Sequence, residues 1–215
     1  SVTVSITDNE SAPTVTLDVS SNSIAENSGS IISVTATLSS LSYQAITVGL
    51  SATGGDSTVV SGADYSVSSS ITINANTSSA AVSFTPVDDS GNPVYEENET
   101  VTLAISGIAS GSASLGATTS KTVTITENET VPSITLSGAT SIDEKTQTAT
   151  ITATSSIKAD ANITLTFANS GAASASTDYN LSNITISSGS TSGSSTFTPV
   201  SDTNYEGGSE TAILT

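Results

Sequence analysis

The residues best placed to do chemistry are carboxylates crowded into one short stretch, residues 86–100. This stretch holds Asp88, Asp89, Glu96, Glu97 and Glu99, and it contains no Lys or Arg. Carboxylates this close repel one another unless something neutralises them. Ca²⁺ does so readily, since it takes about six to eight oxygen ligands, whereas Mg²⁺ demands a tighter octahedral geometry. The alternative is a solvated acidic loop that keeps the protein soluble.

The segments on either side of this stretch must position the acids, and they alternate apolar and polar residues. A period of two predicts half-buried strands. The pattern predicts strands at Thr14–Val19, Ile31–Leu38, Ile46–Ala52, Ser70–Ile73, Ala80–Val87, Thr100–Ser106 and Lys121–Thr126. The predicted inward faces are Val15, Leu17, Ile32, Val34, Ala36, Leu38, Ile46, Val48, Leu50, Val82, Phe84, Val101, Leu103, Ile105, Val123 and Ile125. Short strands between Gly, Ser and Asn turns predict an all-β, immunoglobulin-like seven-stranded sandwich.

The acids are sorted to one end of the predicted sandwich. In a mostly antiparallel fold, alternate loops lie at opposite ends. Besides the stretch 86–100, the acids at this end are Glu26, Asp56, Asp64, Glu127 and Glu129. The loops at the other end, 39–45, 74–79 and 107–120, contain no acid. Solvation alone does not sort charge in this way, so we expect a cation site, and the number of carboxylates favours two or more bridged Ca²⁺ ions.

The sequence contains two copies of one module. Residues 84–87 (FTPV) return as 197–200, and residues 24–26 (IAE) return as 142–144 (IDE). Residues 4–10 likewise match 123–129. We therefore expect three segments: 1–10 as the last strand of a preceding repeat, 11–129 as a complete repeat, and 130–215 as a second repeat without its last strand.

Taken in order, Ile24-Ala25-Glu26, Asp64-Tyr65, Asp88-Asp89, the run from Tyr95 to Thr100 and the closing run from Ile125 to Glu129 resemble the Calx-β family. That family includes regulatory domains of sodium–calcium exchangers and repeats of bacterial adhesins. The resemblance implies a Ca²⁺ cluster at the end facing the next domain. By position, the implied ligands are Glu26, Asp64, Asp88, Asp89, Glu96 and Glu99, with Glu127 and Glu129 from the exit segment. Exchanger domains close with a run of Asp, from which Glu127-Asn128-Glu129 departs.

The second copy keeps most of this set. Its implied ligands are Glu144, Asp178, Asp202, Glu206 and Glu210. Ser201 stands where the first copy has Asp88, which predicts fewer or weaker Ca²⁺ sites. Asp8 and Glu10 match the exit acids and are the implied ligands of the preceding copy. The tyrosines beside ligand positions, Tyr65, Tyr95, Tyr179 and Tyr205, are expected to pack and fix the loops.

Composition excludes several classes of function. The formal net charge is −17, from 20 acidic residues against 3 Lys or Arg, so phosphate backbones and anionic membrane surfaces are not expected partners. Cys and His are absent, which removes disulfides, zinc sites with nitrogen or sulfur ligands, and Ser-His or Cys-His nucleophiles. We expect a protein that is not an enzyme.

The expected function is a Ca²⁺-binding structural repeat of a large extracellular or cell-surface adhesin, filament or matrix protein. The alternatives are an intracellular Ca²⁺ sensor of the exchanger type and a non-catalytic spacer of a secreted enzyme. Affinity separates the first two, because a sensor needs a dissociation constant of about 10⁻⁷–10⁻⁵ M and extracellular modules about 10⁻⁴–10⁻³ M.

The expected partners are neighbouring repeats of the same chain, as in a long array. A second interpretation is head-to-tail strand exchange, in which Val2–Thr7 of one molecule pairs with the second repeat of another.

Overall fold

The computed structural model describes residues 1–55, 59–145, 147–203 and 207–215. The chain divides into two compact units: unit 1 is Ser1–Ser90 with Glu97–Asn128, and unit 2 is Gly91–Glu96 with Glu129–Thr215. Over the described ranges both are built from strands, and the helical exception is the 3-10 turn Glu26–Ser28. No helix in these ranges is long and apolar enough to cross a membrane. The all-β prediction is confirmed.

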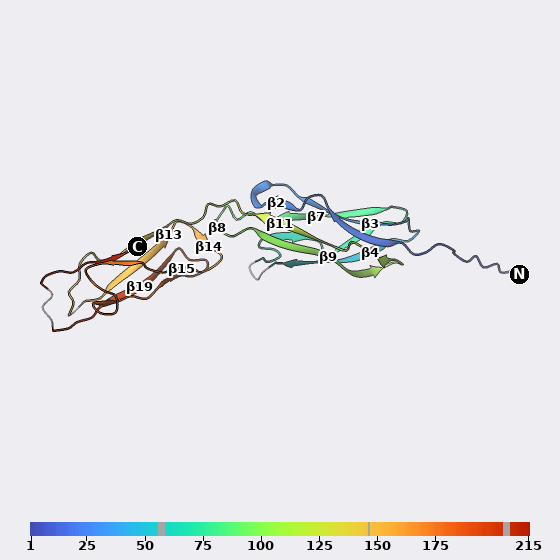
Figure 1. The fold of residues 1–215 in the computed structure, drawn as a ribbon. Coiled ribbons are helices and arrows are strands. Elements are labelled where there is room, and N and C mark those ends of the chain that lie inside the picture. Colours follow the sequence, from blue (N-terminus) through green and yellow to red (C-terminus); the bar gives the residue numbers. More distant parts are fainter. Residues whose placement is uncertain (56–58, 146, 204–206) are drawn as a thin grey trace. The chain divides into compact units, whose positions relative to one another are not determined.

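Unit 1 consists of two five-stranded sheets (Figure 1). The first has the strand order β10-β1-β3-β7-β5 and the second the order β2-β11-β9-β4-β6. The first contains β1 Thr14–Val19, β3 Ile32–Leu38, β5 Tyr65–Val67, β7 Ser79–Pro86 and β10 Ser114–Leu115. The second contains β2 Ser23–Ala25, β4 Ile46–Gly54, β6 Ser70–Ile73, β9 Glu99–Ser110 and β11 Ser120–Thr126. Apolar side chains from both sheets form one core, so the unit is sandwich-like.

The core of unit 1 follows the alternation of the sequence. Every residue predicted to face inward is buried except Val82, which is half-buried. Ile24, Ile71 and Ile73 join this core from the short strands β2 and β6. Tyr65 also joins it, and its ring stacks on Phe84 with the centroids 5.2 Å apart. The expected packing role of this tyrosine is confirmed.

The seven predicted strands are found within a few residues, but unit 1 also contains β2, β5 and β10, and the pairing differs as well. The segment β6 pairs with β4, whereas the shorter β5 pairs with β7. The chain therefore changes sheets between Val67 and Ser70. At the other end of the sequence, residues 1–9 form no strand and extend away from the sheets of unit 1 (Figure 1).

Unit 2 repeats part of this arrangement with shorter strands. One sheet has the order β12-β13-β19-β17, and the remaining strands form the pairs β15-β18, β16-β20 and β14-β8. The sheet contains β12 Ile134–Ser137, β13 Ala149–Ser155, β17 Tyr179–Asn180 and β19 Ser192–Pro199. The pairs are formed by β8 Val94–Tyr95, β14 Lys158–Ala159, β15 Ile163–Leu165, β16 Asn169–Gly171, β18 Ile184–Ile186 and β20 Ala212–Leu214. Tyr179 stacks on Phe197 at 4.5 Å, as Tyr65 does on Phe84.

The middle of the acidic stretch is a strand of unit 2. In β8, Val94 lies opposite Lys158 and Tyr95 opposite Ala159. The Lys158 ammonium also donates to the Asn92 side-chain oxygen at 3.0 Å. Because this segment hydrogen-bonds to residues 158–160, it belongs to unit 2, while residues on both sides of it belong to unit 1.

Candidate metal centre

Strand pairing in unit 1 brings the first two acids together. The strands β2 and β11 run parallel, with Ile24 opposite Ile125 and Ala25 opposite Thr126. The next residues along the two strands are Glu26 and Glu127, which therefore leave the sheet side by side. One carboxylate oxygen of each lies within 4.8 Å of the other.

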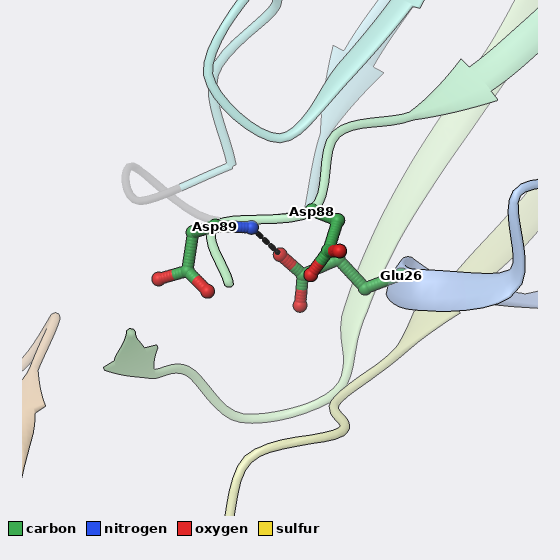
Figure 2. Close-up of side chains that lie close together, drawn as sticks. All are labelled: Glu26, Asp88 and Asp89. Carbon is green, nitrogen blue, oxygen red and sulfur yellow. Dashed lines mark hydrogen bonds between the residues drawn. The ribbon is translucent and has the colours of Figure 1, made fainter. Parts of the chain in front are cut away.

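The loop after β7 adds two carboxylates to Glu26. Oxygens of Glu26, Asp88 and Asp89 all lie within 4.8 Å of one another (Figure 2). The Asp89 amide donates to the Glu26 carboxylate at 3.3 Å, which fixes the loop against the 3-10 turn. Glu26 is buried, with 7% of its surface exposed, Asp89 is half-buried and Asp88 is exposed. One buried carboxylate is thus shared by two groups of acids.

A second pair of buried carboxylates comes from Asp64 and Glu99. Oxygens of the two lie within 4.8 Å of each other, and both residues are more than nine-tenths buried. The Asp64 carboxylate accepts a hydrogen bond from the Val60 amide, and its carbonyl accepts one from the Val87 amide at 2.9 Å. Burial, and then the charge of Asp64, raise the pKa of the Tyr65 hydroxyl above its usual value.

Sequence reasoning missed one residue of this region, Asn98. Its side-chain oxygen accepts a hydrogen bond from the Glu127 amide at 3.0 Å. This bond holds the exit segment beside the start of β9. Its position between Glu97 and Glu99 was the available signal, because a residue next to a ligand position often orients the loop.

Five further acids that the sequence singled out lie in unit 2, in the N-terminal segment or outside the described residues. Glu96 and Glu129 are half-buried and belong to unit 2. Asp8 and Glu10 lie in the exposed N-terminal segment, where the Glu10 amide donates to Asp8 at 3.3 Å. Hydrogen bonds with Glu10 lower the pKa of the Asp8 carboxyl. Asp56 lies outside the described residues.

Unit 2 reproduces the backbone frame of the site. The Asp202 amide donates to Glu144 at 3.0 Å, as the Asp89 amide does to Glu26. The Ser174 amide donates to the Asp178 carboxylate at 2.6 Å, and the Val200 amide donates to the Asp178 carbonyl at 2.8 Å. These bonds match those of Asp64 with Val60 and Val87.

The carboxylates of unit 2 are less concentrated. Ser201 stands in the loop where unit 1 has Asp88, and Glu144 and Glu210 are exposed. Within the described ranges of unit 2, no three carboxylates meet the distance that groups Glu26 with Asp88 and Asp89. Glu206, like Tyr205, lies outside the described residues.

The oxygen spacing in unit 1 suits a calcium-sized cation. Ca²⁺–oxygen distances are about 2.3–2.6 Å, so ligand oxygens around one ion lie within roughly 5 Å of each other. The protein has few cations of its own to neutralise the acids. Of these, Lys121 forms an ion pair with Asp18 at 2.9 Å, which lowers the pKa of the Asp18 carboxyl. Lys158 donates to Asn92.

Comparisons with known proteins give a likeness in structure alone. No family model matches the chain, and no curated protein matches it. Among solved structures, a two-domain protein with unknown function from Bacteroides fragilis is similar to 87% of this chain over 84% of its own, with 10% identity and a TM-score of 0.37. A likeness at this TM-score carries no argument about function.

The turn that holds Glu26 depends on Gly29. This glycine ends the 3-10 turn in the left-handed region, with φ 61°. We expect Gly29→Ala to lower the free energy of unfolding of unit 1 by about 1 kcal/mol, because a Cβ is disfavoured in this region. Urea unfolding measures the change. Unchanged urea unfolding of unit 1 in the variant would show that Gly29 does not constrain the turn.

Proposed function

We propose that this chain is a pair of Ca²⁺-binding structural repeats from a large extracellular or cell-surface protein, with immunoglobulin-like seven-stranded sandwiches of the Calx-β type. The observation that carries the proposal is the convergence of Glu26, Asp88 and Asp89, whose oxygens lie within 4.8 Å of one another. The carboxylates of Asp88 and Asp89 add negative charge next to the buried Glu26 carboxylate. A bound cation removes that repulsion, and Ca²⁺ accepts the all-oxygen ligand set.

Two ions are supported better than one. Glu26 is close to the Asp88–Asp89 pair and also to Glu127, so its two oxygens can serve neighbouring ions. Asp64 and Glu99 form a further pair of buried carboxylates, for which a cation supplies the countercharge. Main-chain carbonyls and water complete the coordination of each Ca²⁺, which takes about six to eight oxygens.

Ca²⁺ bound to these carboxylates lies next to the residues where the chain passes from unit 1 to unit 2 and back. Residues 91–96 belong to unit 2, whereas Asp89 precedes them and Glu99 follows them in unit 1. Cations bound by the Glu26–Asp88–Asp89 group and by the Asp64–Glu99 pair hold the residues on both sides of the segment within unit 1. The proposed role is therefore mechanical: the metal limits movement of the connections between repeats. No residue needs to do catalysis in this role.

Hydrogen exchange tests the mechanical role directly. In the full chain, saturating Ca²⁺ should slow exchange of the backbone amides of residues 87–90 and 97–100 at least about tenfold, because local opening must then release the metal. The loop 39–45 contains no acid and serves as the internal control. Slowing in residues 87–90 and 97–100 that exceeds any change in the loop 39–45 is the expected result. Unchanged exchange in these residues at saturating Ca²⁺ would contradict the proposal.

A further inference from the structure

The loop after β13 in unit 2 carries an added strand on its edge. Its short strand β14 pairs in parallel with β8, and Ala159 lies opposite Tyr95 (Figure 1). The amide of the next residue, Asp160, donates to the Tyr95 carbonyl at 3.2 Å. This loop therefore holds an extended segment through main-chain hydrogen bonds.

The corresponding loop of unit 1 has a matching sequence. Residues 36–47 (ATLSSLSYQAIT) align with residues 153–164 (ATSSIKADANIT) without a gap. At the start of the two loops, the hydroxyls of Ser39 and Ser156 each accept a hydrogen bond from a main-chain amide, at 2.9 and 3.0 Å. The counterparts of Lys158, Ala159 and Asp160 are Leu41, Ser42 and Tyr43.

The two loops also have the same backbone arrangement where the added strand lies. In unit 1 the Asn76 amide donates to the Ser42 carbonyl at 2.8 Å. In unit 2 the Gly189 amide donates to the Ala159 carbonyl, also at 2.8 Å. Both donors have a positive φ, 59° for Asn76 and 72° for Gly189. The neighbouring turn thus holds the inner side of each loop in the same way, and the outer edges correspond.

The outer edge in unit 1, residues 41–43, is open. The three counterparts in unit 2 are buried or half-buried. By contrast, Leu41 is 63% exposed, Tyr43 is 87% exposed and Ser42 is half-buried. The Tyr43 amide corresponds to the one that bonds to the Tyr95 carbonyl, and it has no hydrogen-bond partner among the described residues. An edge with free main-chain groups is a template for another strand.

We propose that residues 41–43 are a docking edge for an extended segment of the β8 type, supplied by the acidic loop of another repeat of this kind. The segment adds in parallel, as β8 does to β14, with its tyrosine opposite Ser42. The carbonyl of that tyrosine accepts from the Tyr43 amide. The proposal rests on the structural-repeat role proposed above and does not need the metal.

Charge at this end of unit 1 suits such an occupant. The loops 39–45, 74–79 and 107–120 contain no acid, although the chain has a formal net charge of −17. A segment of the β8 type brings acids with it, since Glu96 and Glu97 follow β8. It therefore meets less repulsion here than beside the carboxylates of the other end. The exposed Leu41 and Tyr43 offer apolar contacts to its valine and tyrosine.

A separate peptide should bind this edge weakly. It makes few main-chain hydrogen bonds, so we expect a millimolar dissociation constant. A repeat joined to unit 1 by a short flexible connection presents the segment at a similar effective concentration, which is enough to fill the edge.

Nuclear magnetic resonance of the isotope-labelled full chain in chelator tests the proposal. The probe is a peptide with the sequence of residues 90–97 (SGNPVYEE), blocked at both ends. It should shift the amide signals of residues 41–45 and 74–78 in a saturable way. The amides of residues 158–160 are the internal control, because β8 already pairs with them. A peptide with Tyr95→Pro lacks a main-chain amide for the parallel pairing and should bind at least about tenfold more weakly.

Leu41→Lys tests the register without weakening the fold. It restores the counterpart of Lys158, whose ammonium donates to Asn92. The variant should bind the peptide about twofold more tightly, which is the size of an exposed charged contact. Val131→Lys is the matched control, because Val131 is 66% exposed and the substitution adds the same charge.

The possible results separate docking from the metal site. Saturable shifts at residues 41–45, weakened by Tyr95→Pro in the peptide and strengthened by Leu41→Lys alone, support docking. No shift at these residues at millimolar peptide, equal binding of the two peptides, or equal tightening by the two Lys variants overturns it. Since the titration contains chelator, a chain that binds no Ca²⁺ can still dock the peptide, and a failure to dock does not affect the proposed metal site.

Discussion

Saturating Ca²⁺ should raise the unfolding temperature of unit 1 by about 10 °C relative to chelator. A metal that binds only the folded state adds about 2.7 kcal/mol at a concentration one hundred times its dissociation constant. For a unit of this size, each kcal/mol moves the unfolding temperature by a few degrees. The empty site has clustered carboxylates around the buried Glu26, and relief of their repulsion is part of the binding free energy. Scanning calorimetry of the full chain measures the shift.

Glu26→Gln should remove most of that shift. Gln keeps an oxygen that can accept the hydrogen bond from the Asp89 amide, so the frame of the site is preserved. The substitution removes the charge that is shared between the Asp88–Asp89 pair and Glu127. In chelator, the variant should unfold at the same temperature as the wild type or higher, since repulsion is lower.

Asp18→Asn is the control for a lost carboxylate outside the site. Asp18 is exposed and pairs with Lys121, so its substitution should leave the Ca²⁺ shift intact. Because the pKa of Asp18 is lowered in the folded state, any stability from this pair is present above the ordinary carboxyl pKa and lost as pH falls. At neutral pH the substitution removes this stability equally with and without Ca²⁺, so the difference in unfolding temperature between Ca²⁺ and chelator is unchanged. An equal loss of the Ca²⁺ shift in Glu26→Gln and Asp18→Asn would show that the shift depends on net charge and not on this site.

The second large effect is expected in unit 2 from Ser201→Asp. The hydrogen bond from the Asp202 amide to Glu144 shows that the loop already has the backbone arrangement of unit 1. What it lacks is the carboxylate that Asp88 supplies there. Restoring it should tighten Ca²⁺ binding by unit 2 at least about tenfold, since a charged ligand replaces a neutral one.

Titration calorimetry of the full chain carrying Glu26→Gln isolates the response of unit 2. Ser187→Asp is the matched control, because it adds the same charge in the loop before β19, whereas Ser201 follows that strand. Affinity that rises with Ser201→Asp and stays constant with Ser187→Asp is the expected outcome. If both substitutions act alike, ligand number in this loop does not set the affinity.

Alternation in the sequence predicted the strands of unit 1 because burial alternates with the same period. Residues such as Val15, Phe84 and Leu103 are fully buried where the pattern placed them inside. The pattern could not say that β6 pairs with β4, since partner choice depends on which sheet edge is open. It also could not predict β8, because its partner Lys158–Ala159 lies far along the sequence, in the second copy.

Part of the acidic site could also be predicted from the sequence. Alternation of the loops predicted that Glu26, Asp88 and Asp89 share an end, and the three lie close together. The repeat aligned Ser201 with Asp88, and the bond from the Asp202 amide to Glu144 matches that from the Asp89 amide to Glu26. Hydrogen bonds that hold the acids, such as that from Glu127 to Asn98, have no sequence signature of their own. The assignment of Glu96 to unit 2 depended on the pairing of β8.

Equilibrium dialysis of the full chain against radioactive Ca²⁺ tests the central claim most directly. The account predicts saturable binding with a dissociation constant of about 10⁻⁴–10⁻³ M, the range of extracellular modules, and a clear loss of bound metal with Glu26→Gln but not with Asp18→Asn. Binding of about 10⁻⁷–10⁻⁵ M would instead favour a sensor. No bound Ca²⁺ above the free concentration at millimolar metal would contradict the account.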